Sequence, residues 1–232
     1  MMLQSINKKK IYFYIFLFLF LSTIFNLNLL KSFKEIISVN NINIKGLNKS
    51  EEMLVKEELK VLLKNNIFFL QKDLILESLD KFNFLENIIV NKTFPSKINI
   101  YLEKTKFVAL TLIDGEKYYI GKNGKTTNTK QIINKKNLPI VFGKFKINEF
   151  LQLQEILKKQ KINLDEIEKY FYFRNNRWDL QKKDGLIIML PSNNLERSLK
   201  IYKKFMSNKN SNLIKIIDLR IANQIILTNE KK

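Results

Sequence analysis

Residues 11–30, IYFYIFLFLFLSTIFNLNLL, form an uncharged apolar run that directly follows three lysines at positions 8–10. A helix of this length rises about 30 Å, which matches the hydrocarbon thickness of a bilayer. Fourteen of its residues are Ile, Leu or Phe, and at roughly −0.4 kcal/mol each they favour insertion by about 6 kcal/mol. The sequence therefore predicts a single transmembrane helix at 11–30 that ties the chain to a lipid bilayer.

The lysines before the run predict that residues 1–10 are a cytoplasmic N-terminus, because basic flanks stay on the cytoplasmic side. The following domains would then lie on the other side of the membrane. A cleaved signal peptide is the alternative. The run is longer than the usual signal-peptide core, and Ala109 is the first alanine in the chain, so no A-x-A-like site follows it. We therefore expect an uncleaved signal anchor.

The composition argues against most kinds of active site. The chain has no cysteine and no histidine, which excludes disulfides, thiolate or imidazole metal sites and a Ser-His-Asp triad. Neither a G-x-x-x-x-G-K-[ST] loop nor a G-x-G-x-x-G motif occurs, so the usual phosphate-binding signatures are missing. We expect no enzyme, no cofactor, no metal and no small-molecule substrate.

The net charge of +19 suggests a nucleic-acid partner at first sight. The excess is nearly all lysine, however, and the chain has only four arginines and no basic stripe with interleaved aromatic residues. Arginine is the residue that best reads phosphates and guanine. We therefore interpret the lysines as a solvated surface and expect no nucleic-acid partner.

Residues 36–105 carry a strand–helix–helix–strand–strand pattern. The apolar spacing changes between the periods of a strand and of a helix, and Phe94-Pro95 marks a turn between the last two strands. Two amphipathic helices can cover one face of a three-stranded sheet. The expected elements are a strand at 36–45, helices at 51–64 (with Ser50 as N-cap) and 72–82, and strands at 87–93 and 98–102.

Residues 106–228 predict a sheet-dominated α+β domain, followed by a short tail at 229–232. Short alternating runs are separated by turn dipeptides such as Asn175-Asn176 and Asp184-Gly185. The fold class of the whole chain is thus α+β. We expect strands at 107–113, 117–120, 168–174, 177–181, 186–190, 213–220 and 224–228, and helices at 148–159 and 194–206.

Several short strings follow one another along the chain. They are VNNINIKGL at 39–47, FPSKI at 94–98, LPIVFG at 138–143, RWDL at 177–180 with later Asp184-Gly185 and Leu190-Pro191, and IDLR at 217–220. Taken in order, these strings resemble the FtsQ/DivIB family of bitopic bacterial cell-division proteins, and residues 36–105 resemble its POTRA domain. Phe94 stands where the family usually has tryptophan, and Lys104-Thr105-Lys106 replaces its E-R-x-P continuation.

The resemblance implies a scaffold of the division machinery, or divisome. Such a protein would lie in the inner membrane with its large domains in the periplasm, at the division septum. It would bind FtsB-like and FtsL-like proteins and help regulate septal peptidoglycan synthesis. The family's FtsB contact lies on the last strands of the β domain, where an edge strand can accept a partner strand.

When the family's contact is transferred to the matching positions of this chain, it implies a specific set of partner-binding residues. Arg220 would pair with a partner carboxylate, and Ile221 would supply an apolar anchor. Trp178 fits an ordinary core position better than a surface contact. The full set is Arg220, Ile221, Ala222, Asn223, Gln224 and Ile225, with Arg177 and Trp178 as secondary candidates.

Two other classes of function stay open at this point. One is a POTRA-bearing component of envelope transport or outer-membrane assembly, although the second domain lacks a long series of membrane-strand signals. The other is a membrane-tethered cell-wall hydrolase that uses paired carboxylates. Asp165, Glu166 and Glu168 are the closest acidic cluster for that chemistry, but such a cluster also fits a solvated face.

Overall fold

The computed structural model describes residues 8–24, 27–132, 134, 136–207 and 214–229. The chain forms two compact units, one made of Met1–Lys81 and Asn87–Glu103, the other of Phe82–Glu86 and Lys104–Lys232. Parts of the predicted N-terminus and of the tail at 229–232 lie outside the described residues.

The apolar run is divided between two helices, where the sequence predicted one helix at 11–30. Helix α1 spans Lys8–Ile24 and α2 spans Leu27–Ile36. Within the described ranges, we find no helix that combines the length and the apolar character needed to cross a membrane.

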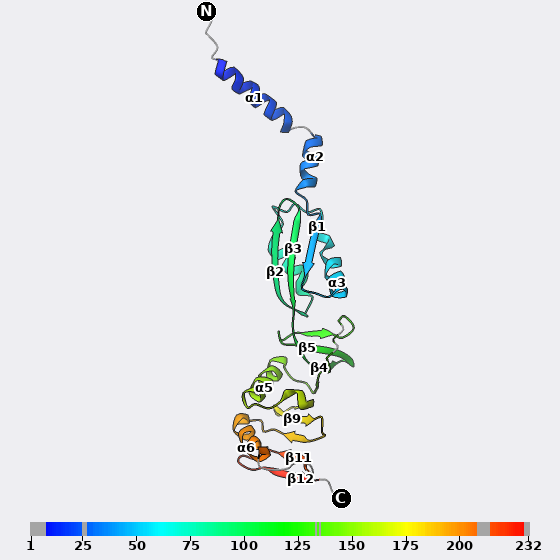
Figure 1. Ribbon diagram of the computed structural model, residues 1–232, viewed down its shortest axis with the longest axis vertical. Helices are drawn as coiled ribbons and strands as arrows, with labels where there is room; N and C mark the ends of the chain where they lie inside the picture. Colours follow the sequence, from blue (N-terminus) through cyan, green and yellow to red (C-terminus); the bar gives the residue numbers. More distant parts are fainter. Residues whose placement is uncertain (1–7, 25–26, 133, 135, 208–213, 230–232) are drawn as a thin grey trace, which may run out of the picture. The chain divides into compact units, whose positions relative to one another are not determined.

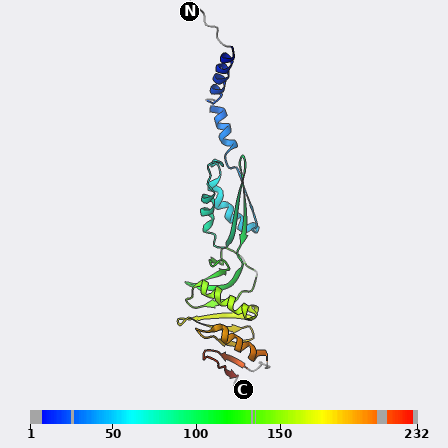
Figure 2. The ribbon, with the colours of Figure 1, turned by 90° about the vertical axis from the view of Figure 1, so that its left-hand side faces the viewer.

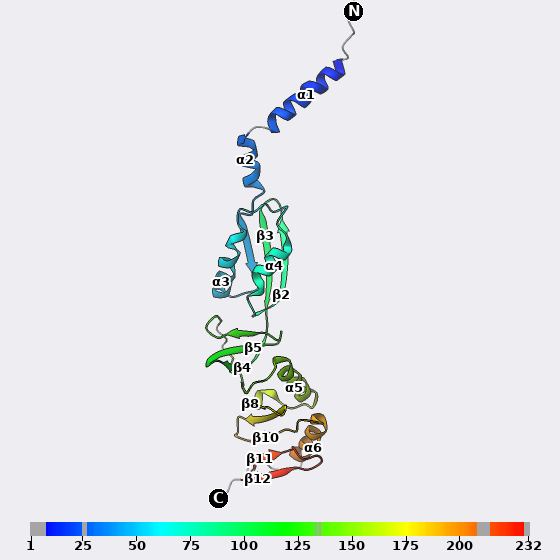
Figure 3. The same ribbon diagram turned by 180° about the vertical axis from the view of Figure 1, so that it is seen from behind.

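The first unit has the predicted strand–helix–helix–strand–strand order. Its sheet has the order β1-β3-β2, with β1 (Asn41–Lys45) parallel to β3. Helices α3 (Lys49–Leu59) and α4 (Lys72–Asp80) lie on the same face of this sheet (Figures 1 and 3). The other strands are β2 (Leu85–Thr93) and β3 (Lys97–Lys104), and the short helix η1 is Lys60–Leu62.

Buried side chains from all three layers fill the core of this unit. Val55 of α3, Ile75 of α4 and Ile98 of β3 are completely inaccessible to solvent. The helices thus turn their apolar faces toward the sheet, as their spacing predicts.

Most boundaries in this unit differ from the prediction by a few residues, and two of the differences have a clear local cause. Helix α3 is capped by Asn48 rather than Ser50, because the Asn48 side chain accepts from the Glu51 N–H at 2.9 Å and the Glu51 carboxylate accepts from the Asn48 N–H. This is a complete capping box. Strand β1 begins at Asn41 rather than at 36, because α2 continues through Ile36 and residues 37–40 hydrogen-bond to loop residues instead of joining the ladder.

The second unit contains a nine-stranded sheet with the order β12-β11-β10-β9-β8-β7-β4-β5-β6. Helices α5 (Ile147–Lys159) and α6 (Leu195–Ser207) lie on the same side of it (Figures 1 and 2). The strands are β4 (Phe107–Ile113), β5 (Glu116–Gly121), β6 (Thr126–Asn128), β7 (Ile140–Phe142), β8 (Ile167–Phe173), β9 (Arg177–Lys182), β10 (Ile187–Met189), β11 (Ile214–Asp218) and β12 (Ile226–Asn229); the short helix η2 is Leu164–Glu166.

The two faces of this sheet differ in character. One row of paired residues, Tyr170, Leu180, Ile188 and Ile217, is buried in the core that also holds Phe150 of α5. Neighbouring residues in a strand point to opposite faces, so the adjacent row lies on the other face. That row is Phe171, Asp179, Met189, Asp218 and Ile226.

Candidate protein-binding edge

Strand β12 is the terminal strand of the nine-stranded sheet. It pairs antiparallel with β11, with Ile217 opposite Leu227 and Asp218 opposite Ile226. On the other side of β12, no strand among the described residues pairs with it. A terminal strand of this kind presents N–H and C=O groups to which another chain can bind.

The turn before β12 holds most of the predicted partner-binding residues. The sequence placed a strand at 224–228, but β12 starts only at Ile226. Asn223 adopts a φ of 64°, and the Gln224 N–H donates to the Ile221 carbonyl at 3.2 Å, which closes a turn. Arg220, Ile221, Ala222, Asn223 and Gln224 therefore form an exposed turn next to the edge strand, and Ile225 is half-buried against the core.

Arg220 is held by a neighbouring carboxylate from the same chain. Its Nε donates to both oxygens of Asp218 at 2.9 and 3.0 Å, and its Nη2 donates to Oδ2 at 2.6 Å. The backbone N–H of Arg220 also donates to Asp218 Oδ1 at 2.9 Å. These hydrogen bonds lower the pKa of Asp218, because they favour its charged form.

A second arginine–aspartate pair lies on β9. Arg177 Nε faces Asp179 Oδ1 at 3.3 Å, and the Arg177 guanidinium lies 4.2 Å from the centre of the Phe173 ring. The Asp179 side chain is 8% exposed. Burial raises the pKa of Asp179, and the charge of Arg177 offsets part of that rise.

The two pairs occupy the same face of the sheet. Asp179 and Asp218 both lie opposite Met189 on the intervening strand β10, so their backbones are about 10 Å apart, two strand spacings. Strands β9 and β11 run in opposite directions, since β10 is antiparallel to one and parallel to the other. Arg177 and Arg220 therefore fall at the same end of this face, close to the turn.

Trp178 does not belong to the exposed site. Its side chain points to the opposite face from Asp179 and is only 7% exposed. The indole packs against Tyr172, Phe145 and Phe150, with ring centres 4.8, 5.6 and 5.9 Å away. The structure therefore places this secondary candidate in the hydrophobic core of the second unit rather than in the exposed turn.

Asp218 and Asp179 are absent from the site residues predicted from the sequence, although the predicted edge at 221–228 did include the exposed residues of β12. Both aspartates lie two residues from an arginine, in R-W-D at 177–179 and D-L-R at 218–220. Residues two apart in a strand share a face, so this spacing was the available signal. Ile226 is 45% exposed and Thr228 is also exposed.

The acidic cluster offers little to an acid–base mechanism. Glu166 forms an ion pair with Lys182 at 2.8 Å, and this hydrogen bond lowers the pKa of Glu166. A general acid needs the opposite shift. Asp165 and Glu168 line a cavity of about 970 Å³ whose walls also carry lysines 106, 122, 136, 158 and 183.

Both units match families of known proteins. Residues 37–104 match the family model described as "POTRA domain, FtsQ-type". Residues 109–220 match the model described as "Cell division protein FtsQ/DivIB, C-terminal". The second match ends at Arg220, so residue 221 and strand β12 lie beyond it.

Several curated proteins are similar to the chain over much of its length. A cell division protein FtsQ of Rickettsia typhi is 26% identical over 190 residues, which cover 80% of this chain and 70% of the relative. An FtsQ of Rickettsia bellii is 26% identical over 202 residues, or 85% and 74% of the two chains. A cell division protein DivIB of Clostridium botulinum is 26% identical over 112 residues, covering 48% and 43%.

Proposed function

Because the chain belongs to the FtsQ/DivIB family of cell-division proteins, we propose that it is a scaffold of the divisome that binds FtsB-like and FtsL-like proteins. In this proposal a partner segment adds to the nine-stranded sheet along β12. Docking in this way would let the protein help regulate septal peptidoglycan synthesis without carrying out chemistry itself.

The position of β12 at the end of the sheet is the observation that supports this proposal most strongly. A partner strand can satisfy the outward backbone groups of β12, and its side chains can contact Ile226 and Thr228. Backbone pairing supplies affinity, while the exposed side chains supply specificity.

The charge next to this edge suits an acidic partner segment. Asp218 orients the Arg220 guanidinium through Nε and Nη2, and arginine has five N–H donors in all. The donors that Asp218 does not use can bind a carboxylate of the partner. Ile221 at 50% exposure provides an apolar contact beside it.

We further propose that residues 11–30 anchor the chain in the inner membrane, with residues 1–10 in the cytoplasm and both units in the periplasm at the septum. The uncharged apolar run and the preceding lysines support this orientation. The match of residues 109–220 to the FtsQ/DivIB C-terminal model favours a role in division over one in envelope transport.

The edge mechanism can be tested by co-purification of an FtsB-like partner with the full chain from membranes. The double change Ile226→Lys and Thr228→Lys places charges of the kind that block strand addition at sheet edges. We expect at least a tenfold loss of affinity, while the unfolding transition stays in place. Ile113→Lys is the matched control, because Ile113 is 40% exposed on β4 at a different part of the same sheet.

Equal recovery of the partner with the double variant and with the control would disprove docking at β12. Division-site localisation is a separate readout. A fluorescent fusion that stains the envelope evenly, without a mid-cell band, would contradict the divisome role itself.

A further inference from the structure

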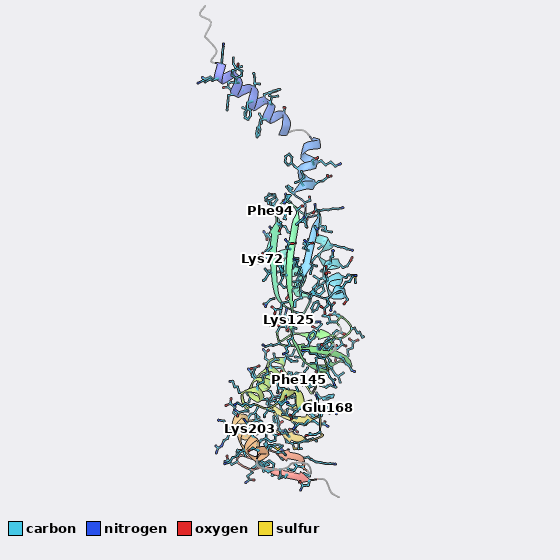
Figure 4. The ribbon with its side chains drawn as sticks, in the orientation of Figure 1. Lys72, Phe94, Lys125, Phe145, Glu168 and Lys203 are labelled. Carbon is cyan, nitrogen blue, oxygen red and sulfur yellow. The ribbon has the colours of Figure 1, made fainter. Side chains whose placement is uncertain are left out.

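Three exposed phenylalanines gather on two loops of the first unit. Phe68 and Phe69 lie in the loop between η1 and α4, and Phe94, which is labelled in Figure 4, lies in the turn between β2 and β3. Their exposed fractions are 57%, 82% and 55%. The rings of Phe68 and Phe94 stack with their centres 4.8 Å apart, so the two loops present one aromatic surface rather than scattered side chains.

Backbone hydrogen bonds tie both loops to the residues that directly follow α2. The Ile67 N–H donates to the Ile37 carbonyl at 2.9 Å, and the Val39 N–H donates to the Asn65 carbonyl at 2.8 Å. On the other loop, the Asn40 N–H donates to the Ser96 carbonyl at 3.0 Å. The aromatic surface is therefore held beside residues 37–40.

This attachment limits how far the loops can lie from the end of the apolar run. Position 37 lies seven residue steps after position 30, and α2 is helical through Ile36. At 1.5 Å per helical residue, the distance along the chain is about 10 Å. The headgroup layer on each side of the hydrocarbon core is roughly 5–8 Å thick. An apolar run in the hydrocarbon core would thus bring the loops to the headgroup layer or its outer boundary.

The charge of the same region complements an anionic surface. The three segments 31–40, 64–72 and 93–97 together contain five lysines and one acidic residue, Glu35. Lys31, Lys34, Lys64 and Lys97 are all exposed. Basic residues that flank a membrane segment bind anionic lipid headgroups, and aromatic side chains favour the interface between headgroups and hydrocarbon.

We propose that these two loops form a bilayer-docking surface, in which Phe69 and Phe94 enter the headgroup layer and the surrounding lysines bind anionic phospholipids. The inference rests on the proposed anchor at residues 11–30. Docking would fix the orientation of the first unit relative to the membrane, in addition to the tether.

A single nitroxide label can measure the depth of this surface, because the chain has no cysteine. Gln71→Cys is a suitable site, since Gln71 is exposed next to the loop and its side chain makes no capping hydrogen bond. The full chain is placed in nanodiscs of phosphatidylethanolamine and phosphatidylglycerol. The accessibility of the nitroxide to molecular oxygen is compared with its accessibility to a water-soluble nickel chelate. Lys203→Cys on α6 (Figure 4) serves as the reference label.

We expect the label at position 71 to be several-fold less accessible to the nickel chelate than the label at position 203. Adding Phe69→Ser and Phe94→Ser should remove this protection, whereas Val61→Ser should preserve it, because Val61 is 71% exposed in the same unit but lies outside the two loops. Nanodiscs of phosphatidylcholine alone should give weaker protection, since they lack anionic headgroups.

Equal nickel accessibility at positions 71 and 203 in anionic nanodiscs would overturn the proposal. Protection that persists in lipid-free amphipol would also overturn it, because the loops would then be covered by protein. A chain that alkaline carbonate washes off the membrane would instead refute the anchor. An anchored chain with an exposed label refutes only the docking surface.

Discussion

The change Asp218→Asn probes the ion pair that shapes the candidate edge. Asp218 lies on β11 and accepts hydrogen bonds from both the backbone and the side chain of Arg220. Asparagine has nearly the same shape but no charge, and it offers one acceptor oxygen where the carboxylate offers two. The substitution should therefore loosen the turn before β12 while the core stays intact.

The expected loss of stability is modest. The asparagine oxygen can still accept from the Arg220 N–H, but a hydrogen bond to a carboxylate is stronger than one to a neutral oxygen by about 1 kcal/mol. The Arg220 side chain is 44% exposed, so solvent screens the ion pair, and its contribution is about 0.5 kcal/mol. The free energy of unfolding should thus fall by about 1.5 kcal/mol. With a urea dependence of about 2 kcal/mol per molar, the midpoint should fall by about 0.7 M.

Fluorescence of Trp178 is a direct assay for this effect. It is the only tryptophan of the chain and lies in the core of the second unit, so its emission reports the unfolding of that unit. The exposed Asp114→Asn in the β4–β5 turn is the control substitution. A midpoint that moves no further for Asp218→Asn than for this control would refute the energetic role of the pair.

The pH dependence gives a second check on the same reasoning. The pKa of Asp218 in the folded protein lies below its ordinary value of 3.8, so its stabilising contribution is complete above that value. It is lost as the pH falls through the lowered pKa. Burial shifts the pKa of Asp179 upward, but Asp179 is present in both the wild type and the Asp218→Asn variant. The stability difference between wild type and Asp218→Asn should therefore shrink below about pH 4, and a constant difference would contradict the assignment.

Two further substitutions test local features of the fold. Asn48→Ala should destabilise α3 by about 1 kcal/mol because it removes the cap, and hydrogen exchange of the α3 amides should accelerate accordingly. Ser50→Ala should have little effect on this exchange. Faster exchange in Ser50→Ala than in Asn48→Ala would instead identify Ser50 as the cap. Gly143→Ala should cost about 2 kcal/mol or more, because φ there is +109° and a Cβ would lie 2.4 Å from the Tyr172 carbonyl oxygen. Its urea midpoint by Trp178 fluorescence should fall more than that of Gly115→Ala, where a Cβ meets no atom within 4 Å, and equal midpoints would contradict the clash.

Local patterns predicted most of the longer elements to within a few residues. Helix α5, predicted at 148–159, spans Ile147–Lys159, and β4 has its predicted bounds of 107–113. Alternation and helical spacing are properties of neighbouring residues, so they can be read without the fold. Strands β6 and β7 were missed because each has only three residues and neither lies within a longer uninterrupted apolar run, whereas the equally short β10 lies within the apolar run at 186–190.

The candidate edge was predictable in part. Its approximate position near Arg220 follows from the resemblance to relatives. The pairing of Arg220 with Asp218, the burial of Trp178 and the turn at Asn223 all depend on contacts within the folded second unit. For this reason the prediction from sequence included Trp178 among the possible surface contacts and began the last strand two residues before its observed start.

The sequence by itself determined the apolar run with its basic flank, the α+β class and the membership of the FtsQ/DivIB family. These properties depend on composition, periodicity and the order of short strings. Only the tertiary structure decided that β12 ends the sheet and that Phe68 stacks on Phe94. Strand order and loop contacts arise from pairing between residues that are distant in the chain, and no local pattern of side chains encodes which neighbours they acquire.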